Sequence, residues 1–153
     1  MRSPPPSSPA PLREPGRPVT LSYIRRGGRR PRIISSMPDT SPDCLFCKIV
    51  AGQIPAKFLH ETADTLAFAD IHPQAPVHVL VIPKRHIRSH AHALPDDAAL
   101  LGRLFAAAGD IAREQPLDNG YRLVVNTGSD GGQTVDHLHV HILGGRALGW
   151  PPG

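Results

Sequence analysis

The 153-residue sequence has little cysteine and no long apolar segment. Its two cysteines, Cys44 and Cys47, are too few for the disulfide framework of a small secreted protein. No apolar run approaches the roughly 18 residues that a membrane-spanning helix needs. These absences exclude the disulfide-stapled and membrane-spanning classes, and we expect a soluble, cytoplasmic protein.

Positive charge is scarce outside the first 36 residues, although the whole chain has a formal net charge of +4. Residues 1–36 contain eight arginines and one acidic residue, Glu14, for a net charge of +7. The remaining 117 residues contain nine basic and twelve acidic side chains, for a net charge of −3. Because sequence-independent binding to nucleic acid needs a basic surface, this part is not expected to bind nucleic acid or a membrane. A local anion pocket made of backbone N–H groups remains compatible with it.

The beginning of the chain is rich in proline, serine, glycine and arginine. Such a segment buries too little apolar surface to offset its ordering entropy. We therefore predict a disordered basic tail over residues 1–40 and one domain over residues 41–153. The tail has three open interpretations: an organelle-targeting peptide, a nucleic-acid-binding arm, or an over-extended reading frame whose true start is Met37. We favour the last, because every feature typical of a domain follows Met37.

The rest of the sequence predicts one α+β domain. A short helix is expected from Cys44 to Gly52, and a long helix opens at Pro95 and ends before Pro116. Its apolar stripe at helical spacing consists of Leu100, Leu101, Leu104, Phe105, Ala108, Ile111 and Ala112. Strands are expected over Lys57–Glu61, Thr65–Asp70, His78–Pro83, Tyr121–Asn126 and, approximately, Val135–Leu143. The expected fold is an antiparallel sheet of about five strands with one long helix and a short N-terminal helix.

Three histidines alternate in the last predicted strand, in the run His137-Leu138-His139-Val140-His141. Because successive strand side chains point to opposite faces, the imidazoles are expected on one face and the apolar residues on the other. Imidazoles about 7 Å apart raise the cost of charging one another, which favours neutral forms near pH 7. A neutral imidazole can act as nucleophile, general base or metal ligand, so a three-histidine zinc site is one interpretation.

A glycine-rich loop, Ser129-Asp130-Gly131-Gly132-Gln133-Thr134, precedes this run. Glycines let the backbone approach a bound anion, and Gln133 and Thr134 add polar donors. A phosphate held over the loop would face His139. This arrangement favours nucleophilic displacement at phosphorus over the metal interpretation.

The sequence resembles the histidine triad (HIT) family in several segments. The pattern Gln133-Thr134-x-x-His137-Leu138-His139-Val140-His141-Ile142-Leu143 is similar to the family signature. The ending Gly144-Gly145-Arg146-x-x-x-Trp150-Pro151-Pro152-Gly153 resembles the Hint branch, the purine nucleoside phosphoramidases. Cys44–Pro55, Leu66–Ile87 and Gly120–Gln133 also match, so the resemblance covers about residues 44–153. It implies a HIT-like fold and a homodimer with the long helix and residues 121–126 at the two-fold axis and Trp150 near the partner's site.

The resemblance also implies catalytic roles. His139 matches the nucleophile, which forms a nucleotidyl-imidazole intermediate that water hydrolyses. His141 matches a contact to phosphate oxygens, His137 helps to orient the nucleophile, and His78 supports the cluster from the neighbouring strand. Thr134 stands where the family usually has serine, and its hydroxyl is the hypothetical proton donor to the leaving amine.

The nucleotide-binding residues follow from the same resemblance. Asp70 matches the carboxylate that binds the ribose hydroxyls. The apolar slot for the purine corresponds to Leu45, Phe46, Ile49, Phe68 and Ile71. The phosphate loop corresponds to Asn126, Gly132, Gln133 and Thr134. By periodicity alone the apolar set would be core, and a purine slot that adjoins the core satisfies both interpretations.

The implied reaction is hydrolysis of purine nucleoside 5′-phosphoramidates, such as AMP-lysine, to the nucleoside monophosphate (AMP) and the amine. An alkylamine has a conjugate-acid pKa near 10.4, so its expulsion needs a proton donor, which either Thr134 or a triad imidazolium could supply. Two alternatives are kept: cleavage of dinucleoside polyphosphates by the same nucleophile, and a nucleotide-binding interaction protein with incidental turnover. The Trp-Pro-Pro-Gly ending disfavours the polyphosphate alternative.

The pair Cys44-x-x-Cys47 supplies half of a tetrahedral zinc site. Some bacterial members of the family complete such a site with the histidine after the Ile-Pro-Lys turn and the first triad histidine, which correspond here to His86 and His137. A structural zinc ion on these four residues and a pair of free thiols both remain open. No cofactor is expected to take part in catalysis.

Overall fold

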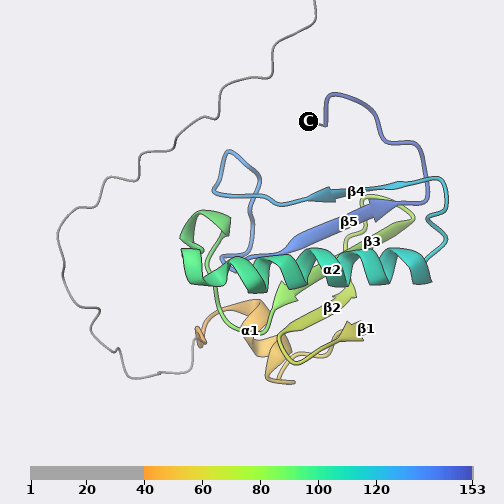
Figure 1. The fold of residues 1–153 in the computed structure, drawn as a ribbon. Coiled ribbons are helices and arrows are strands. Elements are labelled where there is room, and N and C mark those ends of the chain that lie inside the picture. Colours follow the sequence, from red (N-terminus) through yellow and green to blue (C-terminus); the bar gives the residue numbers. More distant parts are fainter. Residues whose placement is uncertain (1–39, 153) are drawn as a thin grey trace, which may run out of the picture. The chain divides into compact units, whose positions relative to one another are not determined.

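The computed structural model describes residues 40–152, so the predicted tail lies, except for Thr40, outside the described residues (Figure 1). The elements are α1 (Leu45–Val50), β1 (Phe58–Glu61), β2 (Thr65–Ala69), β3 (Val77–Pro83), the short 3-10 helices η1 (His90–His92) and η2 (Pro95–Asp97), α2 (Ala98–Glu114), β4 (Tyr121–Val124) and β5 (Val140–Gly144).

The five strands form one antiparallel sheet in the order β1-β2-β3-β5-β4. Every residue of β3 is buried, as expected for a β-branched apolar run at the centre of a sheet. β5 pairs with β3 so that His141 lies opposite Leu80. The predicted α+β, HIT-like architecture of five strands, one long helix and a short N-terminal helix is confirmed.

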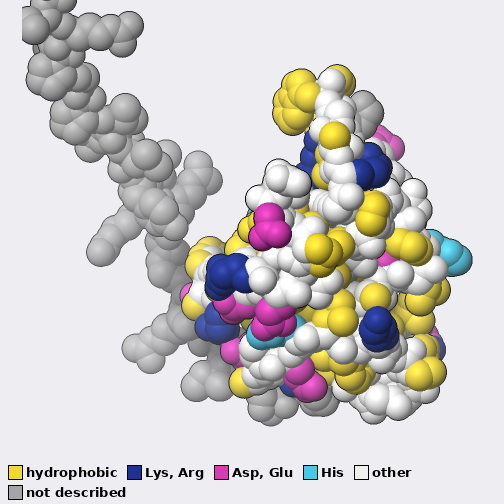
Figure 2. Space-filling view, turned by 90° about the vertical axis from the view of Figure 1, so that its right-hand side faces the viewer, with side chains coloured by type: hydrophobic (Ala, Val, Ile, Leu, Met, Phe, Trp, Pro, Cys, Tyr) yellow, Lys and Arg dark blue, Asp and Glu magenta, His cyan; other side chains and the backbone are white. Residues whose placement is uncertain are grey.

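The surface carries charges of both signs close together. On the face shown in Figure 2, Lys and Arg side chains lie beside Asp and Glu side chains, with apolar side chains spread among them. Ion pairs such as Arg103–Asp64, at 2.8 Å, belong to this mixed surface. Among residues 40–152, no helix has both the length and the apolar character needed to cross a membrane.

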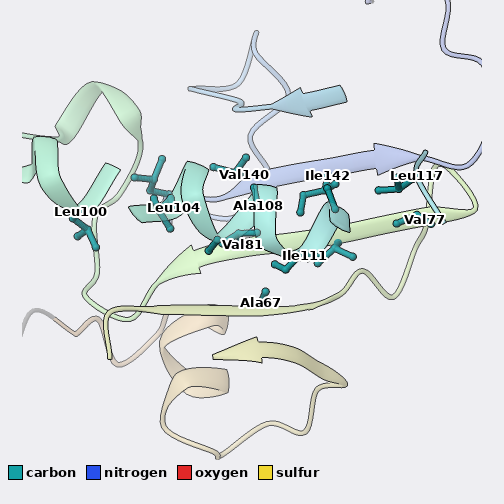
Figure 3. Packing of buried hydrophobic residues seen from close by; sticks show 14 of the residues in the cluster. Ala67, Val77, Val81, Leu100, Leu104, Ala108, Ile111, Leu117, Val140 and Ile142 are labelled. Carbon is teal, nitrogen blue, oxygen red and sulfur yellow. The ribbon is translucent and has the colours of Figure 1, made fainter. Parts of the chain in front are cut away.

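α2 covers one face of the sheet and forms the larger apolar core with it (Figure 3). The strand residues of this core include Ala67, Val77, Val79, Val81, Val140 and Ile142. The helix contributes Leu100, Leu104, Ala107, Ala108, Ile111 and Ala112. Phe105 was predicted in the stripe but is 49% exposed, because the sheet covers only one side of the helix. The prediction for Phe105 is therefore wrong.

α1 covers the opposite face of the sheet with a smaller apolar cluster. Phe46 and Ile49 of α1 pack with Leu66, Phe68, Leu80 and Ile82 of β2 and β3. Leu138, Val140 and Ile142 belong to the α2 side, whereas the rings of His137 and His139 contact Phe46. The predicted alternation around the histidines is confirmed.

β5 begins at Val140, later than the predicted start near Val135. The preceding residues bond to other segments instead, since the Leu138 N–H donates to the carbonyl of Ile87. The fully buried His137 side chain bonds to the Pro83 carbonyl at 2.9 Å, which draws this segment toward the end of β3. The residues before Val140 are thus held by contacts outside the pairing of β3 with β5.

Candidate active site

A cavity of about 720 Å³ lies between α1, the end of β2 and the start of β5. Its apolar walls include all five residues predicted for the purine slot: Leu45, Phe46, Ile49, Phe68 and Ile71. Its polar residues include Asp70, Thr134, His139 and His141. An apolar cavity with a few convergent polar groups is typical of a small-molecule site.

His139 is held with one ring nitrogen free. Its Nδ1 lies 2.6 Å from the backbone oxygen of His137. Because a carbonyl only accepts hydrogen bonds, Nδ1 must carry the hydrogen, and Nε2 keeps its lone pair. The residue is 4% exposed, lines the cavity and lies edge-on to Phe46, with ring centroids 5.4 Å apart. The ring is therefore fixed in the tautomer that a nucleophile requires.

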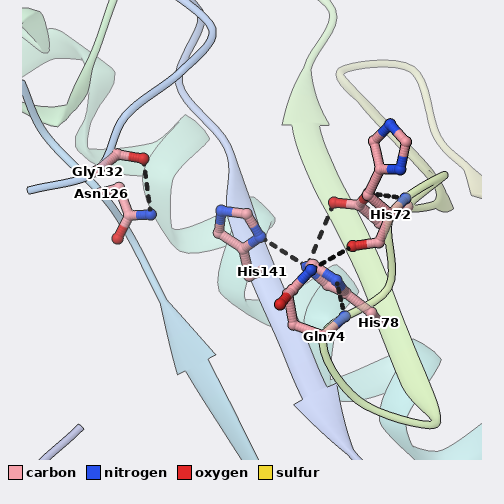
Figure 4. A network of polar contacts seen from close by, with 7 residues as sticks. His72, Gln74, His78, Asn126, Gly132 and His141 are labelled. Carbon is pink, nitrogen blue, oxygen red and sulfur yellow. Dashed lines mark hydrogen bonds and ion pairs between the residues drawn. The ribbon is translucent and has the colours of Figure 1, made fainter. Parts of the chain in front are cut away.

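A chain of hydrogen bonds determines where His78 and His141 carry their hydrogens (Figure 4). The Gln74 backbone N–H donates to His78 Nδ1 at 3.1 Å, so neutral His78 carries its hydrogen on Nε2. That hydrogen is donated to His141 Nδ1 at 2.8 Å, so neutral His141 carries its own on Nε2. This buried Nε2 has no hydrogen-bond partner among the described residues. An unpaired buried donor is costly, and a phosphate oxygen is a suitable acceptor for it.

Asp70 lies at the edge of this network and also lines the cavity. One carboxylate oxygen accepts the His72 N–H at 2.7 Å, and the other lies 3.4 Å from His78 Nε2. Both oxygens retain lone pairs, so the carboxylate can still accept hydrogen bonds from a ligand hydroxyl.

Burial favours the neutral forms of His141 and His78. The pKa of His141 is lowered to about 4, first by burial and then by the charges of His139 and His78, while Asp70 opposes the shift. Burial likewise lowers the pKa of His78, with Asp70 again opposing. The predicted neutrality is confirmed for His141, but burial contributes more to it than repulsion between the imidazoles does.

His137 has different neighbours. Its Nε2 lies 2.9 Å from the Pro83 carbonyl and so carries the hydrogen, which leaves a lone pair on Nδ1. That Nδ1 lies 3.4 Å from Cys44 Sγ and 3.7 Å from Cys47 Sγ. Burial lowers the pKa of His137 to about 4, and its side chain is not among those that line the cavity. Its backbone oxygen is the contact that links it to His139.

The four residues predicted as zinc ligands lie together. One ligand atom from each of Cys44, Cys47, His86 and His137 lies within 4.8 Å of all the others. His86 Nδ1 is 3.4 Å from Cys47 Sγ. Ordinary Zn–N and Zn–S bonds at tetrahedral angles put nitrogen and sulfur about 3.6 Å apart. The observed separations fit a closed, structural type of site.

The side chain of Gln133 braces the glycine-rich loop. Its Oε1 accepts the Gly128 N–H at 3.0 Å, and its Nε2 donates to the carbonyls of Arg88 and Val135 at 2.7 and 2.9 Å. These contacts use both hydrogens of the amide group. The side chain of Gln133 therefore shapes the loop.

The other predicted loop residues also lie beside the cavity rather than in its wall. Asn126, Gly132 and Gln133 are not among the lining residues, whereas Thr134 is. Asn126 donates to the Gly132 carbonyl at 3.4 Å (Figure 4). A Cβ atom on Gly131 would lie 2.5 Å from the backbone oxygen of Thr127, so the loop requires glycine there. The loop thus brings Thr134 to the wall of the cavity.

Some lining residues have no individual signal in the sequence. Lys57 and His72 line the cavity, and His72 is exposed there; neither residue belongs to a motif in the sequence. The contacts that set the histidine tautomers come from the backbone of Gln74, Pro83 and His137. Backbone groups occur at every residue, so side-chain identity could not have revealed them.

The fold and the site define an α+β protein with a histidine-based site for a small ligand. The chain matches the HIT domain model over residues 51–148. It is 52% identical to an uncharacterized HIT-like protein of Synechococcus elongatus, over 74% of this chain and 99% of that protein. The chain therefore belongs to the HIT family.

Solved structures agree with this assignment. A HIT family hydrolase from Legionella pneumophila is 50% identical with a TM-score of 0.71, over 72% of this chain and all of the other. A histidine triad nucleotide-binding protein from Candida albicans is 36% identical with a TM-score of 0.59, over 71% of this chain and 83% of the other. The chain is thus a HIT protein similar to hydrolases of the family.

Proposed function

We propose that this protein hydrolyses purine nucleoside 5′-phosphoramidates and that His139 is the nucleophile. One observation carries the proposal. The 2.6 Å hydrogen bond from His139 Nδ1 to the His137 backbone oxygen leaves the Nε2 lone pair on a side chain that lines the cavity. A neutral imidazole held in this way needs no deprotonation before it attacks phosphorus.

In the first step, His139 Nε2 forms a bond to phosphorus while the P–N bond breaks. The electron pair of the P–N bond stays on nitrogen, which takes a proton from the Thr134 hydroxyl. The Nε2–H of His141 donates to a phosphoryl oxygen and stabilises the charge that develops there. The His137 backbone oxygen stabilises the positive charge that His139 acquires.

Water completes the turnover. Its oxygen attacks phosphorus, the bond to His139 breaks, and the electron pair of that bond returns to Nε2. One hydrogen of the water stays in the hydroxyl of the nucleoside monophosphate, and the other restores the Thr134 hydroxyl. The neutral imidazole of His139 and the hydroxyl of Thr134 are then restored for another cycle.

The cavity supports a nucleoside as the other part of the substrate. Phe46 and Phe68 lie edge-on with ring centroids 5.5 Å apart, and their apolar wall suits a purine ring. The free lone pairs of Asp70 suit the ribose hydroxyls. The Candida albicans relative is a histidine triad nucleotide-binding protein, which agrees with this proposal.

The test compares two substrates that share the adenosine monophosphate group. We expect a much higher kcat/KM for AMP-lysine than for diadenosine tetraphosphate, with neither cleaved by His139→Ala. A preference for the tetraphosphate would indicate the polyphosphate hydrolase instead. Tight binding of AMP without turnover of either substrate would indicate a nucleotide-binding protein.

We also propose a structural zinc ion on Cys44, Cys47, His86 and His137. Burial raises the pKa of the Cys47 thiol, so this thiol stays protonated at pH 7 unless a cation binds and displaces its proton. Zinc bound there would tie α1 to the segment before β5. Intact mass under native conditions tests the proposal and also reports whether residues 1–36 are present.

The resemblance to the Hint branch supports a homodimer as a further proposal. β4 lies at an edge of the sheet, so one side of the strand has no neighbouring strand among residues 40–152. Phe105 on α2, Tyr121 on β4 and Trp150 in the C-terminal segment are 49%, 44% and 86% exposed, so these apolar side chains are available to a partner subunit. Sedimentation equilibrium should give twice the chain mass.

A further inference from the structure

A second hollow, of about 580 Å³, adjoins the active-site cavity. The two share three lining residues: Leu45, Thr134 and Val135. Thr134 is the proposed proton donor to the leaving nitrogen. The second hollow therefore begins where the leaving amine has to lie.

The walls of the second hollow change in character away from the shared residues. Leu45 and Val135 are apolar and suit the methylene groups of an aliphatic stem. Three charged residues, Asp43, Arg88 and Asp136, line the second hollow and not the first. The second hollow thus shares Thr134 and two apolar residues with the cavity and adds charged residues of both signs.

The charged groups are available to a ligand. Asp43 is exposed and makes no ion pair or side-chain hydrogen bond within residues 40–152. Arg88 Nη2 lies 3.2 Å from Asp136 Oδ2, and the two side chains are 61% and 68% exposed. Such an exposed pair is weak, and guanidinium has further N–H donors for a carboxylate.

The side of the hollow that carries Arg88 is fixed relative to the proton donor. Gln133 Nε2 donates to the Arg88 carbonyl at 2.7 Å, and Gln133 directly precedes Thr134 in the chain. The Gln133 side chain therefore connects the backbone of Arg88 to the loop that carries Thr134. A leaving group could span these two points with little rearrangement of the protein.

We propose that the second hollow is the subsite for the leaving group and that it selects amines whose aliphatic stem ends in a zwitterion. The ammonium lies at Asp43 and the carboxylate at Arg88. This inference rests on the proposed function and adds residues that determine specificity. A free diamino acid joined to phosphorus through its side-chain amine has both charges, whereas the same side chain inside a polypeptide has neither.

The test uses two phosphoramidates of AMP that differ only in these charges: the Nε-linked free lysine and the Nε-linked Nα-acetyl-lysine amide. Each exposed contact should contribute about three- to fivefold, so the wild-type kcat/KM should favour free lysine by about tenfold. Asp43→Asn and Arg88→Gln should each lower this preference about three- to fivefold. The thermal unfolding midpoint of each variant checks that it is folded.

Two matched variants serve as controls. Asp118→Asn removes another exposed carboxylate, and Arg113→Gln breaks another exposed ion pair, that with Asp110. Both should keep the wild-type preference. If the wild type cleaves both substrates equally, or if both subsite variants keep its preference, the subsite is refuted while the proposed function stands. If the wild type cleaves neither substrate, the proposed function fails and this inference fails with it.

Discussion

Two polar regions on the same face of the sheet divide the three alternating histidines between them. His139 and His141 line the cavity and connect to His78. His137 is fully buried beside the thiols of Cys44 and Cys47. Equal spacing along the chain placed all three imidazoles on one face. The chemistry of each imidazole depends on its neighbours: α1 places the thiols beside His137, and β3 places His78 beside His141.

The two regions differ in which ring nitrogens are unbonded and in the groups that surround them. At the cavity, His139 Nε2 has a lone pair and His141 Nε2 has a hydrogen, a donor–acceptor combination suited to a phosphoryl group. The other region is the cysteine–histidine cluster, which consists of Cys44, Cys47, His86 and His137. There the lone pair of His137 Nδ1 lies beside two thiols, a combination suited to zinc. A 2.6 Å hydrogen bond through the His137 backbone oxygen connects the regions. We expect changes in one region to affect the other mainly through that bond.

The largest expected effect comes from His139→Ala. Without the nucleophile, kcat for AMP-lysine should fall by about four orders of magnitude or more. Zinc content should stay at the wild-type value, because His139 is not one of the four proposed zinc ligands, whereas the thermal unfolding midpoint should fall with the loss of a buried ring. Steady-state kinetics and metal analysis on the same preparation check both parts, and loss of zinc in this variant would contradict the separation of the two regions.

The next effect is the contribution of zinc to stability. With free zinc at about a thousand times its Kd, the folded state gains about 4 kcal/mol. Urea unfolding with and without a chelator should show this difference in the wild type. Cys47→Ala should abolish it, with no zinc found in the native mass spectrum. Equal unfolding midpoints of the wild type in both conditions would refute the zinc site.

A smaller effect is expected at the boundary of the cavity. Thr134→Val keeps the shape but removes the hydroxyl, so kcat for AMP-lysine should fall about 100-fold. A nitrophenyl ester of AMP, whose leaving group needs no proton, should be cleaved at nearly the wild-type rate. Thr134→Ser should retain both activities. Unchanged hydrolysis of AMP-lysine by Thr134→Val would show that another group supplies the proton.

The smallest effect concerns acid stability. The pKa of His141 is lowered from 6.5 to about 4, so the unfolded chain binds the proton more readily between these values. The native state should therefore lose stability as pH falls from 6.5 toward 4, with no further loss from this group below 4. Urea midpoints at pH 7 and pH 5 measure the difference, which His141→Gln should reduce. An equal pH dependence in the variant would contradict the assigned shift.

The sequence predicted the parts of this molecule that depend on local pattern. The buried run of β3, the long helix α2 and the alternation around His139 follow from periodicities that the chain itself displays. The late start of β5 does not, because the residues before Val140 bond to the distant Pro83 and Ile87 instead of extending the pairing with β3. The exposure of Phe105 depends on how much of α2 the sheet covers.

The candidate site was predictable to a similar degree. Its side chains could be named, since the cavity brings together His139, His141, Asp70 and the purine-slot residues. The bracing role of Gln133 and the tautomers of the histidines were not predictable, because backbone groups from separate segments determine them. The second hollow likewise exists only once α1 and the loop are in place.

The most direct test is to trap the intermediate. Protein mixed with excess AMP-lysine is quenched in alkali within milliseconds and digested, and the peptides are sequenced by mass spectrometry. We predict one AMP group, on Nε2 of His139 and on no other histidine. An AMP group on His137 or His141, or none at all during rapid turnover, would contradict the assignment of the nucleophile.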